Sequence, residues 1–577
     1  MSRITTLVLT TCSVACTAAF SGFSQAQSLS VDLIGRYVAD APFATSAAEI
    51  VTYDKNNDQL FVVNAHAQRI EVLKPSATGL EKLRYLDLHQ AGEWANIDIG
   101  AANSVDSYGN LLAVAIENKI KTKPGIIAVY DSRDLSLLTT FPAGSLPDMV
   151  GFSKDGRFLA SANEGEPSGD YQDDPEGSVT LVDLSPGLEQ AKAQQIRFDA
   201  FNQTRRAELK GTVRISGKHA SAAQDLEPEY LTFASNGKLY VSLQENNALA
   251  IIDPVKAEVE AIQGLGMKSW HNAKLDASNK DADPDTKQSG LANFHSYEGL
   301  FGLYMPDTIK SYTVNGKSYI VTANEGDGRE YGFKTTQEQC EQLGLNWDGD
   351  DHQGTSAYKT TLDTCISHSD EVRGKKLDVA SDHPLANALK DNQQLARLKF
   401  IKPDHPLQAN EPALTFGARS FSIWDDKGHL VFDSQDQFAN IVAEQSPNTF
   451  NSTNDNNQSA DDRSDDKGSE PEALEVAMIQ GRQYAFIGLE RQGGFMVYDV
   501  TDPSQASFVL YHQERDFSQP VCTQVDADGE CENQEYNPKA GDLGPESIHY
   551  FMRGNQHYIA IGNEVSGTTS LYHVSIQ

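Results

Sequence analysis

Five pairs of carboxylates recur along this sequence, and the two acids of each pair lie 16 or 18 residues apart. A proline directly precedes the first acid of every pair. The first acids are Asp148, Glu229, Asp307, Glu472 and Glu546, and the second acids are Glu164, Glu245, Glu325, Glu490 and Glu564. Carboxylate oxygens are the hard ligands that calcium prefers, and one calcium ion takes about six to eight oxygens. These residues can therefore bind metal, provided that the fold brings the pairs together.

The residues between two paired acids are typical of a β-hairpin. In "SLPDMVGFSKDGRFLASANEGEPS", residues 145–168, two apolar runs flank a turn at Lys154–Arg157. The strands of a hairpin are antiparallel, so the start of the first and the end of the second lie at one edge of the sheet. An even separation also keeps both acids in the same phase of the side-chain alternation. We therefore expect each hairpin to present two carboxylates at one edge.

The hairpin recurs seven times, which predicts a repeat fold. Two weaker copies begin at Ala48 and Ala102, and they add Glu49 and Glu117 to the acids. Further short strands follow most hairpins, such as "GIIAVYD" from Gly125. About four strands in each of seven units predict an all-β chain, a seven-bladed β-propeller with long loops on one face. The first strand of a blade lines the central channel, so the acids should gather around one channel mouth.

We expect residues 28–577 to form one propeller domain. The stretch "SVDLIGRYVA", residues 30–39, can supply the strand that the last unit lacks. Long connections predict insertions at the acid-bearing mouth, at about 256–304, 332–411, 439–469 and 512–542. Long loops within a compact fold are usually functional lids or disordered segments. We interpret the acid-bearing mouth as a covered site and the opposite mouth as bare.

Many carboxylates at one mouth repel one another, and the repulsion raises their pKa values. Bound cations, Arg and Lys partners, or backbone amides relieve it. The basic residues near the motifs are Arg329, Arg419, Arg463, Lys467 and Arg491. They either neutralise the rim or hold an anionic substrate, and Arg329, Arg463 and Arg491 are the candidates for substrate binding. A simpler alternative is that each second acid, with the Asn before it in three of the copies, only stabilises a turn.

Composition restricts the partners of the protein. The formal net charge of −34 repels nucleic acid and anionic lipid and attracts cations. Arg3, the apolar residues 4–20 and the small residues before Gln27 predict an export signal at residues 1–26, with lipidation of Cys16 as a less favoured alternative. No later stretch is long and apolar enough to span a membrane.

We expect the protein to be a monomer.

Four cysteines remain after the predicted cleavage, and an exported protein can form disulfides. Pairing of nearest neighbours gives Cys340–Cys365 and Cys522–Cys531, and two other pairings are possible. None of the spacings is that of a zinc site. The cysteines therefore predict disulfides that close long loops.

Two loops resemble separate cation binders. "QVDADGECENQE", residues 524–535, is similar to an EF-hand loop with Asp526, Asp528 and Glu535 as calcium ligands, although Gln occupies its first position. The alternative is a solvated acidic loop. "DADPD", residues 281–285, also alternates acids, but it lacks the glycine and the final Glu, and we interpret it as a solvated loop.

Five long motifs resemble the choice-of-anchor I domain family. They are "GSLPDMVGFSKDGRFLASANEGEPS", "DLEPEYLTF…LQENNALAIID", "MPDTIKSY…VTANEGDGREY", "SDDKGSEPEALEV…AFIGLERQGGFMVYDVTDP" and "GDLGPESIHY…IGNEVSGTT". The resemblance covers nearly the whole mature chain and implies an extracytoplasmic β-propeller. It also implies an alkaline phosphatase-like or phytase-like activity, described for some relatives, or the calcium handling of the animal branch. It implies no catalytic residue. Relatives often continue into a C-terminal anchoring segment, whereas this sequence ends after its last predicted strand, so we expect a periplasmic or secreted protein.

Two functions follow from these features. The favoured hypothesis is a metal-dependent phosphomonoesterase, in which Ca²⁺ held by the rim acids polarises a phosphoryl oxygen and acidifies a bound water. Arginine would hold the phosphate of a small substrate, because guanidinium matches phosphate geometry. The alternative is a non-catalytic calcium-binding surface or scaffold protein, which uses the same acids for ions and the long loops for a surface partner. A sugar-binding propeller is a weaker third hypothesis.

Overall fold

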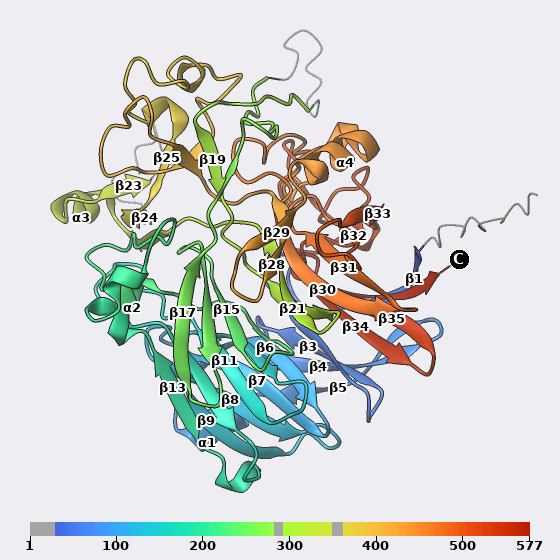
Figure 1. The fold of residues 1–577 in the computed structure, drawn as a ribbon. Helices are drawn as coiled ribbons and strands as arrows, with labels where there is room; N and C mark the ends of the chain where they lie inside the picture. The colour runs from blue at the N-terminus through green and yellow to red at the C-terminus, as the bar shows by residue number, and fades with distance from the viewer. Residues whose placement is uncertain (1–28, 282–291, 349–361, 577) are drawn as a thin grey trace, which may run out of the picture.

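Seven four-stranded antiparallel sheets form the body of the molecule (Figure 1). The computed structural model describes residues 29–281, 292–348 and 362–576. Six of the sheets, in chain order, are β2 (Val51–Asp54), β3 (Gln59–Asn64), β4 (Arg69–Ser76) and β5 (Gly79–Asp87); β6 (Ile99–Tyr108), β7 (Leu111–Asn118), β8 (Pro124–Asp131) and β9 (Leu137–Ser145); β10 (Pro147–Phe152), β11 (Phe158–Asn163), β12 (Ser178–Asp183) and β13 (Ala193–Arg197); β14 (Leu231–Phe233), β15 (Leu239–Leu243), β16 (Ala248–Asp253) and β17 (Glu258–Gly264); β20 (Ile309–Val314), β21 (Lys317–Asn324), β28 (Ser420–Asp425) and β29 (Leu430–Asp433); and β30 (Pro471–Ile479), β31 (Arg482–Leu489), β32 (Phe495–Asp499) and β33 (Ser507–His512).

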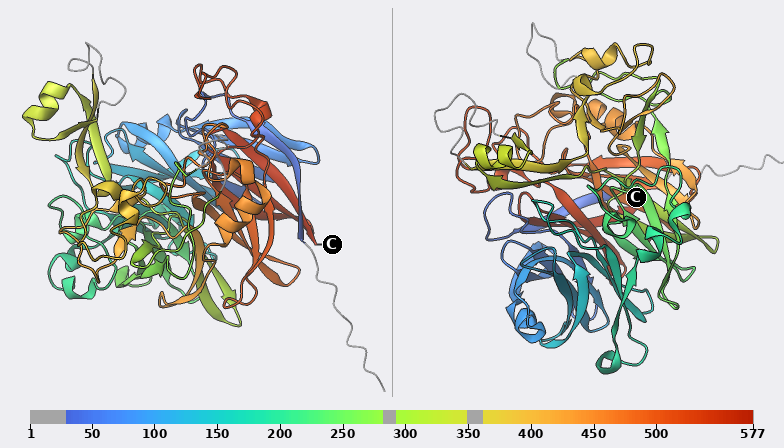
Figure 2. Two further views of the ribbon diagram at one scale, coloured as in Figure 1. Left: turned by 90° about the horizontal axis from the view of Figure 1, so that it is seen from above. Right: turned by 90° about the vertical axis from the view of Figure 1, so that its left-hand side faces the viewer.

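The seventh sheet joins the two ends of the described chain. It contains β34 (Pro545–Arg553), β35 (Gln556–Asn563), β36 (Thr568–Ile576) and, at its outer edge, β1 (Leu29–Val38). Figure 2 shows β1, in blue, beside the last strands, in red. The prediction that residues 30–39 complete the last unit is confirmed.

The first strands of the sheets follow one another in a closed order. Each of β2, β6, β10, β14, β20 and β30 contacts the first strand of the next sheet, and β34 contacts β2 again. The first strands therefore surround a common axis, and the connections at one end of them meet there. The all-β prediction is confirmed.

The turn of the first motif shows why these segments fold as hairpins. Gly156 has a φ of 69°, a conformation that glycine adopts without steric cost. Asp155 Oδ1 accepts hydrogen bonds from the Ser153 hydroxyl at 2.7 Å and from the Arg157 backbone N–H at 3.1 Å. The flanking strands, β10 and β11, then pair antiparallel, as the sequence predicts.

Apolar side chains fill the space between neighbouring sheets. Val63 of β3 and Val72 of β4 are fully buried, and they pack in one cluster with Val105, Val114 and Ala128 of the next sheet. Each buried apolar surface contributes roughly 25 cal/mol per Å². Apolar side chains on the facing sides of the strands therefore hold neighbouring sheets together. The loops take no part in this packing and can carry polar groups.

The longest insertion lies inside one sheet, because residues 325–419 separate β21 from β28. It begins before residue 332 and ends after residue 411, so it is longer than the predicted insertion at 332–411. The insertion predicted from residue 256 begins later, after Gly264, since β17 belongs to a sheet up to that residue.

Smaller elements occupy these insertions. The strands are β18 (Met267–Ser269), β19 (Leu300–Leu303) and β27 (Ala413–Thr415) in one sheet, β22 (Glu330–Thr335), β23 (Asn346–Asp348) and β24 (Asp363–Ser369) in a second, and β25 (Glu371–Arg373) and β26 (Lys399–Ile401) in a third. The α-helices of the described chain are α1 (His89–Ala95), α2 (Ala222–Asp225), α3 (Gln337–Gln342) and α4 (Gln437–Gln445). Short 3-10 helices are η1 (Leu188–Gln190), η2 (Asp199–Asn202), η3 (Arg206–Glu208), η5 (Gly374–Lys376), η6 (Ala388–Lys390), η7 (Pro447–Thr449) and η8 (Pro538–Ala540). Figure 1 places α3, β23, β24 and β25 together, outside the seven sheets.

The features that predicted export fall only partly within the described residues. Both predicted disulfides are present, Cys340–Cys365 between α3 and β24 and Cys522–Cys531 within a short loop. The predicted signal at residues 1–26, with Cys16, lies outside the described residues. Within them, no helix combines the length and the apolar character that crossing a membrane requires.

Candidate metal site at the channel mouth

The predicted acids gather at one mouth of the central channel. An open cavity of about 520 Å³ there is lined by seven of the ten, which are Asp148, Glu164, Glu229, Glu245, Asp307, Glu472 and Glu546. Glu49 and Glu117 of the weaker copies line it too. Glu325 and Glu490 belong to acid groups that adjoin these residues. Glu564 accepts a hydrogen bond at 3.2 Å from the hydroxyl of Ser46, another residue of the cavity wall.

Irregular strand pairing positions three of the first acids. The register of the hairpin shifts between Pro147 and Val150, between Pro471 and Leu474, and between Pro545 and Ser547. Asp148, Glu472 and Glu546 lie at these shifts. Proline has no N–H to give to the sheet and is tolerated at such bulges, and a bulge changes the direction of the side chains around it. The Pro-acid dipeptide is therefore the local signal that marks the channel mouth.

Burial and mutual repulsion raise the pKa values of these acids. Burial is the larger cause, and with the charge of neighbouring carboxylates it raises the pKa of Asp148 to about 8, of Glu245 to about 7 and of Asp307 to about 6. The same causes raise the pKa values of Glu164, Glu229, Glu472 and Glu546 well above the usual range. Without bound cations, these carboxyl groups would keep their protons to a higher pH than a free carboxyl group does.

Two carboxylates of the cavity wall keep a buried oxygen without a hydrogen-bond partner, and these atoms are Glu229 Oε2 and Glu472 Oε2. Glu472 is 9% exposed. One oxygen each of Asp307, Glu325 and Glu472 lie within 4.8 Å of one another. A buried polar atom without a partner is costly, and closely spaced carboxylate oxygens suit a hard divalent cation. The residues at this mouth therefore fit a calcium ion.

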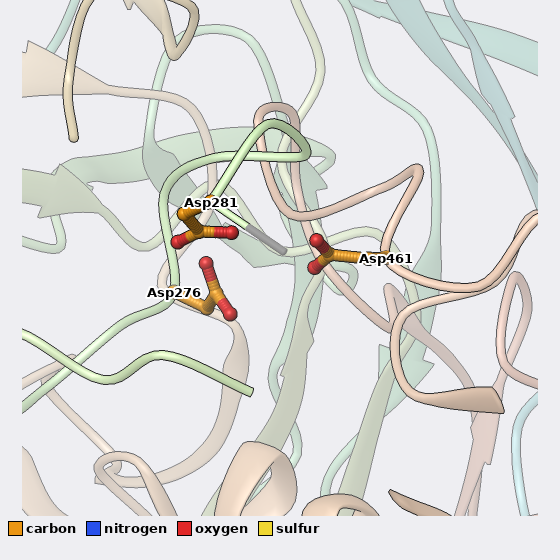
Figure 3. A group of neighbouring side chains, drawn as sticks. All are labelled: Asp276, Asp281 and Asp461. Atoms are coloured by element: carbon orange, nitrogen blue, oxygen red, sulfur yellow. The ribbon is translucent and has the colours of Figure 1, made fainter. Parts of the chain in front are cut away.

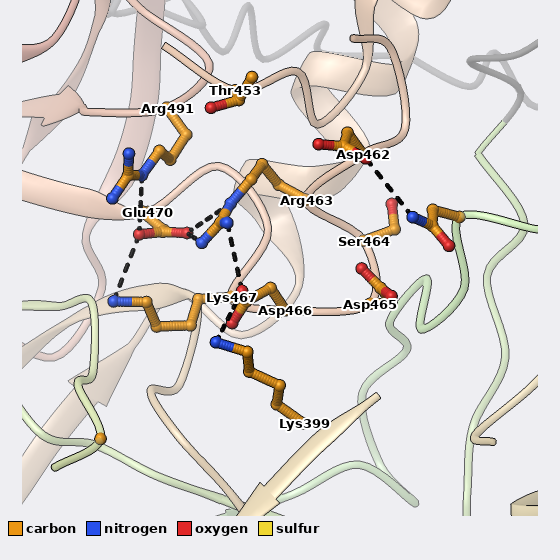
Figure 4. Close-up of polar contacts among 12 residues, drawn as sticks. Lys399, Thr453, Asp462, Arg463, Ser464, Asp465, Asp466, Lys467, Glu470 and Arg491 are labelled. Carbon is orange, nitrogen blue, oxygen red and sulfur yellow. Dashed lines mark hydrogen bonds and ion pairs between the residues drawn. The ribbon is translucent and has the colours of Figure 1, made fainter. Parts of the chain in front are cut away.

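A neighbouring acid group is already neutralised by basic side chains (Figure 4). Glu470 forms ion pairs with Arg463, with Lys467 at 3.3 Å and with Arg491 at 3.2 Å. Burial opposes ionisation, but these three cations hold the pKa of Glu470 well below its usual range. Its oxygens lie within 4.8 Å of those of Glu325 and Glu490. Glu470 is not among the predicted site residues, although the basic residues Arg463 and Lys467 shortly before it are a signal that could have identified it.

Arg329 lies in the interior instead of facing the cavity. Its side chain is 1% exposed, with Nη2 at 2.8 Å from Glu227 and Nη1 at 3.7 Å from Asp225. Nη1 also donates to the Ser216 hydroxyl at 2.8 Å. The sequence leaves two roles open for Arg329, neutralising acids or holding an anionic substrate. Its burial and its ion pairs favour the first role.

The other predicted arginines, Arg419, Arg463 and Arg491, also form ion pairs or hydrogen bonds with groups of the protein. Arg491, with 29% of its side chain exposed, and Arg463, with 19%, both pair with Glu470. Arg419 is buried and donates to the backbone carbonyls of Asp276, Ser464 and Asp466. Substrate binding by Arg463 or Arg491 stays a prediction.

Residues of the 439–469 insertion cover part of the mouth. Lys467 Nζ lies 2.6 Å from Glu325 Oε1, and the side-chain amide of Asn454 donates to Glu490 Oε1 at 2.8 Å. Elsewhere on the rim, Lys121 pairs with Glu166 at 3.0 Å, and its side chain is 58% exposed. The mouth is therefore covered at Glu325 and Glu490 and accessible near Lys121.

The other half of the channel holds a smaller cavity of about 240 Å³. Lys310, Asp106 and Glu475 lie in its wall, so basic and acidic groups are mixed there. Met149 and Tyr230 line both cavities and lie between them. The concentration of carboxylates is thus confined to one half of the channel.

The EF-hand-like loop does not bring its three acids together. Asp526 Oδ1 accepts the backbone N–H groups of Asp528 and Glu530, both at 2.9 Å, which stabilises a tight turn. Glu535 Oε2 instead accepts from the Thr523 hydroxyl at 2.9 Å. The closely spaced acid groups within the described ranges do not include these residues. A calcium ion in this loop stays a prediction without geometric support.

Sheets closed into a ring and a carboxylate-rich mouth define an all-β, propeller-like protein. The chain belongs to the choice-of-anchor I domain family, whose model matches residues 49–503. The predicted family is therefore confirmed.

A curated relative is the mesenchyme-specific cell surface glycoprotein of Strongylocentrotus purpuratus, with 28% identity over 347 residues. The match covers 53% of this chain and 40% of that protein, so the chain spans less than half of this relative's length.

Solved structures resemble the chain only distantly. Hydrazine synthase of Kuenenia stuttgartiensis matches with a TM-score of 0.44 and 10% identity, over 93% of this chain and 99% of that one. The Cps50 (Swd1) β-propeller domain of Myceliophteria thermophila matches with a TM-score of 0.39 and 8% identity, over 95% of this chain and 100% of that one. Likeness at this level says nothing about activity.

Proposed function

We propose that this protein is an exported β-propeller that binds calcium at its channel mouth. The observation that carries the proposal is the group of Asp307, Glu325 and Glu472, whose oxygens lie within 4.8 Å of one another while Glu472 Oε2 has no hydrogen-bond partner. A divalent cation at this position replaces protons and relieves the repulsion between the carboxylates. Lys467 pairs directly with Glu325, at 2.6 Å, and its charge also lowers the pKa of Asp307, but burial still raises that pKa to about 6.

Seven blades account for the arrangement of the sheets. Each four-stranded sheet contributes its first strand to the closed order around the axis, and β1 completes the last sheet from the other end of the chain. A ring closed in this way leaves only short sheet edges. It also holds the hairpin ends, and thus the acids, in fixed positions around the mouth.

The disulfides and the similarity to a cell surface glycoprotein support a location outside the cytoplasm. Disulfides persist in oxidising surroundings, and the described residues form two of them. We infer that the protein is periplasmic or secreted. Extracellular calcium modules bind calcium with dissociation constants of roughly 10⁻⁴ to 10⁻³ M.

Replacing one carboxylate of the mouth tests the proposal. Glu472→Gln removes a ligand charge but keeps the size of the side chain, so it should lower the number of calcium ions bound per chain or weaken calcium affinity at least tenfold. Isothermal titration calorimetry with CaCl₂ measures both. Because the Gln side chain is neutral and needs no proton to relieve the repulsion, the variant without calcium should melt at the same temperature as the wild type or higher.

Glu258→Gln is the matched control, because Glu258 is an exposed strand residue that is absent from the mouth cavity. It should bind calcium as the wild type does. Equal calcium binding by Glu472→Gln and the wild type, or no calcium binding by the wild type, would contradict the proposal.

Phosphomonoester hydrolysis at the same mouth is a second candidate function. The observation that favours it is the cavity of about 520 Å³, which is large enough for a small substrate and carries the accessible Lys121 on its rim. Calcium, when bound, would polarise a phosphoryl oxygen and lower the pKa of a bound water. In this proposal, Lys121 on the rim and the partly exposed Arg491 attract the phosphate, whereas Arg329 is too deeply buried to reach it.

Release of p-nitrophenol from p-nitrophenyl phosphate tests this second function, at about pH 6 to 10 with and without calcium. An enzyme should show calcium-dependent turnover that Glu472→Ala and Glu546→Ala reduce by about 10² or more. A non-catalytic calcium protein should show no turnover, and the two variants should then change only calcium-dependent melting. Absence of turnover with calcium throughout this range excludes the enzyme and leaves the calcium-binding function standing.

A further inference from the structure

Asp276, Asp281 and Asp461 form a carboxylate group that is separate from the channel mouth (Figure 3). One oxygen from each residue lies within 4.8 Å of the others. Asp276 and Asp281 belong to the connection between β18 and β19, and Asp461 belongs to the connection between α4 and β30. Figure 3 shows the three carboxylates turned toward a common point. Two insertions, far apart in the sequence, thus converge on one acidic group.

Neighbouring groups hold the outer oxygens of these carboxylates. Asn293 donates its backbone N–H to Asp276 Oδ2 at 2.7 Å and its side-chain amide to Asp281 Oδ2 at 3.0 Å. The Ser464 hydroxyl donates to Asp461 Oδ1 at 2.6 Å. Metal ligands are commonly oriented by hydrogen bonds of this kind from residues behind them. The arrangement leaves one oxygen each of Asp281 and Asp461 free to face the centre.

These two inner oxygens, Asp281 Oδ1 and Asp461 Oδ2, are buried and have no hydrogen-bond partner. Asp461 is 2% exposed and Asp276 is 1% exposed. Among the described residues, no ion pair involves the three acids; the charges of Arg419 and His295 lower the pKa values of Asp276 and Asp281, but burial is the larger effect and raises both. The buried guanidinium of Arg419 donates to the backbone carbonyls of Asp276 and Ser464 and not to the carboxylates. Buried carboxylates of this kind require a compensating cation or protons.

We propose that Asp276, Asp281 and Asp461 bind a second calcium ion, which ties the β18–β19 connection to the α4–β30 connection. Three carboxylates supply three to six oxygens, and water completes the roughly six to eight that calcium takes. The ion would stabilise the segment that carries Lys467 and Asn454 over the channel mouth. The interpretation of residues 281–285 as a solvated loop is therefore not adopted for Asp281, and the other four residues lie outside the described ranges.

Asp461→Asn tests this site without disturbing the backbone. Asp461 has a φ of 71°, a left-handed conformation that Asn tolerates as well as Asp, and the Asn side-chain oxygen can still accept from Ser464. Equilibrium dialysis with CaCl₂ should show one calcium ion fewer per chain than in the wild type. Asp462→Asn is the matched control, since Asp462 is the adjacent, exposed residue, and it should bind as many ions as the wild type.

Thermal melting gives a second readout, because the substitution should affect the melting temperature differently without calcium and with calcium. Without calcium, Asp461→Asn should melt at the same temperature as the wild type or higher, because a repulsive charge is gone. With calcium, it should gain less stability than the wild type. Equal ion counts in Asp461→Asn and the wild type, or an equal calcium-dependent gain, would overturn the site.

The channel-mouth variant separates this proposal from the proposed function. Glu472→Gln should keep the ion at Asp461, and combining the two substitutions should lower the ion count further than either does alone. If Glu472→Gln has no effect while Asp461→Asn still removes one ion, only the mouth proposal fails. If the reverse holds, only the second site fails.

Discussion

Protein freed of divalent ions should lose thermal stability as the pH rises from about 5 to about 8, and calcium should restore it. The pKa of Asp148 is raised to about 8, that of Glu245 to about 7 and that of Asp307 to about 6. The folded protein thus binds more protons than the unfolded chain over this range. This contribution is fully present below the unfolded pKa values near 4 and is lost as the pH rises through the folded values.

Calcium should reverse this loss, because it binds the ionised carboxylates and replaces the protons. The difference in melting temperature between calcium-loaded and ion-free protein should therefore grow from about pH 5 to about pH 8. At a concentration about a hundred times the dissociation constant, each ion adds about 2.7 kcal/mol. Scanning calorimetry on protein dialysed free of divalent ions measures the effect.

The double variant Glu472→Gln/Glu546→Gln provides the control for this experiment. It should weaken both the pH-dependent loss and the calcium-dependent gain, since both residues line the mouth and have raised pKa values. Ion-free stability that rises toward pH 8, or a calcium effect that does not depend on pH, would argue against a crowded carboxylate site.

Arg329→Met should be among the most destabilising single substitutions in the protein. The guanidinium is buried and pairs with Glu227 at 2.8 Å, and Asp225 lies at 3.7 Å. Removing it leaves two buried carboxylates without a cationic partner, which costs about 3–5 kcal/mol. The midpoint of urea unfolding should fall accordingly.

Two further variants show whether the buried charge is the cause. Arg329→Met/Glu227→Gln should recover part of the stability, because the charge left unpaired is removed along with its partner. Arg133→Ala removes an arginine from an exposed pair with Asp131, and it should leave the unfolding midpoint unchanged, since surface pairs contribute little. A double variant that is no more stable than Arg329→Met would show that packing, not charge, is responsible.

Repetition made much of the fold predictable. The hairpin of residues 145–168 has a turn that its own residues specify, with Gly156 in a left-handed conformation and Asp155 accepting from the turn. Alternating apolar residues bury each sheet between its neighbours. Both are local properties, so seven copies of one pattern were enough to predict seven similar sheets and the closing role of β1.

Repetition of the hairpin also made it predictable that the acids converge at one mouth. The register shifts that orient three of the first acids were not predictable. Even spacing places both acids on one face only in a regular hairpin, whereas Asp148, Glu472 and Glu546 lie where the register shifts. A bulge depends on how two strands fit together, and the proline before each acid is the only local sign of it. The direction of these side chains thus depends on tertiary pairing.

Hairpins are specified by residues close together in the chain, so the repeat of β-hairpins with carboxylates at corresponding ends follows from the amino-acid sequence. Which acids are paired with cations depends on the three-dimensional fold. Glu470 meets Arg463 and Arg491, and Arg329 meets Glu227, across loops whose paths no local pattern specifies. It also brought Asp461 to Asp276, from an insertion nearly two hundred residues away along the chain. Charge compensation acts over a few ångströms in space, whatever the distance along the sequence, so it is determined by the folded loops.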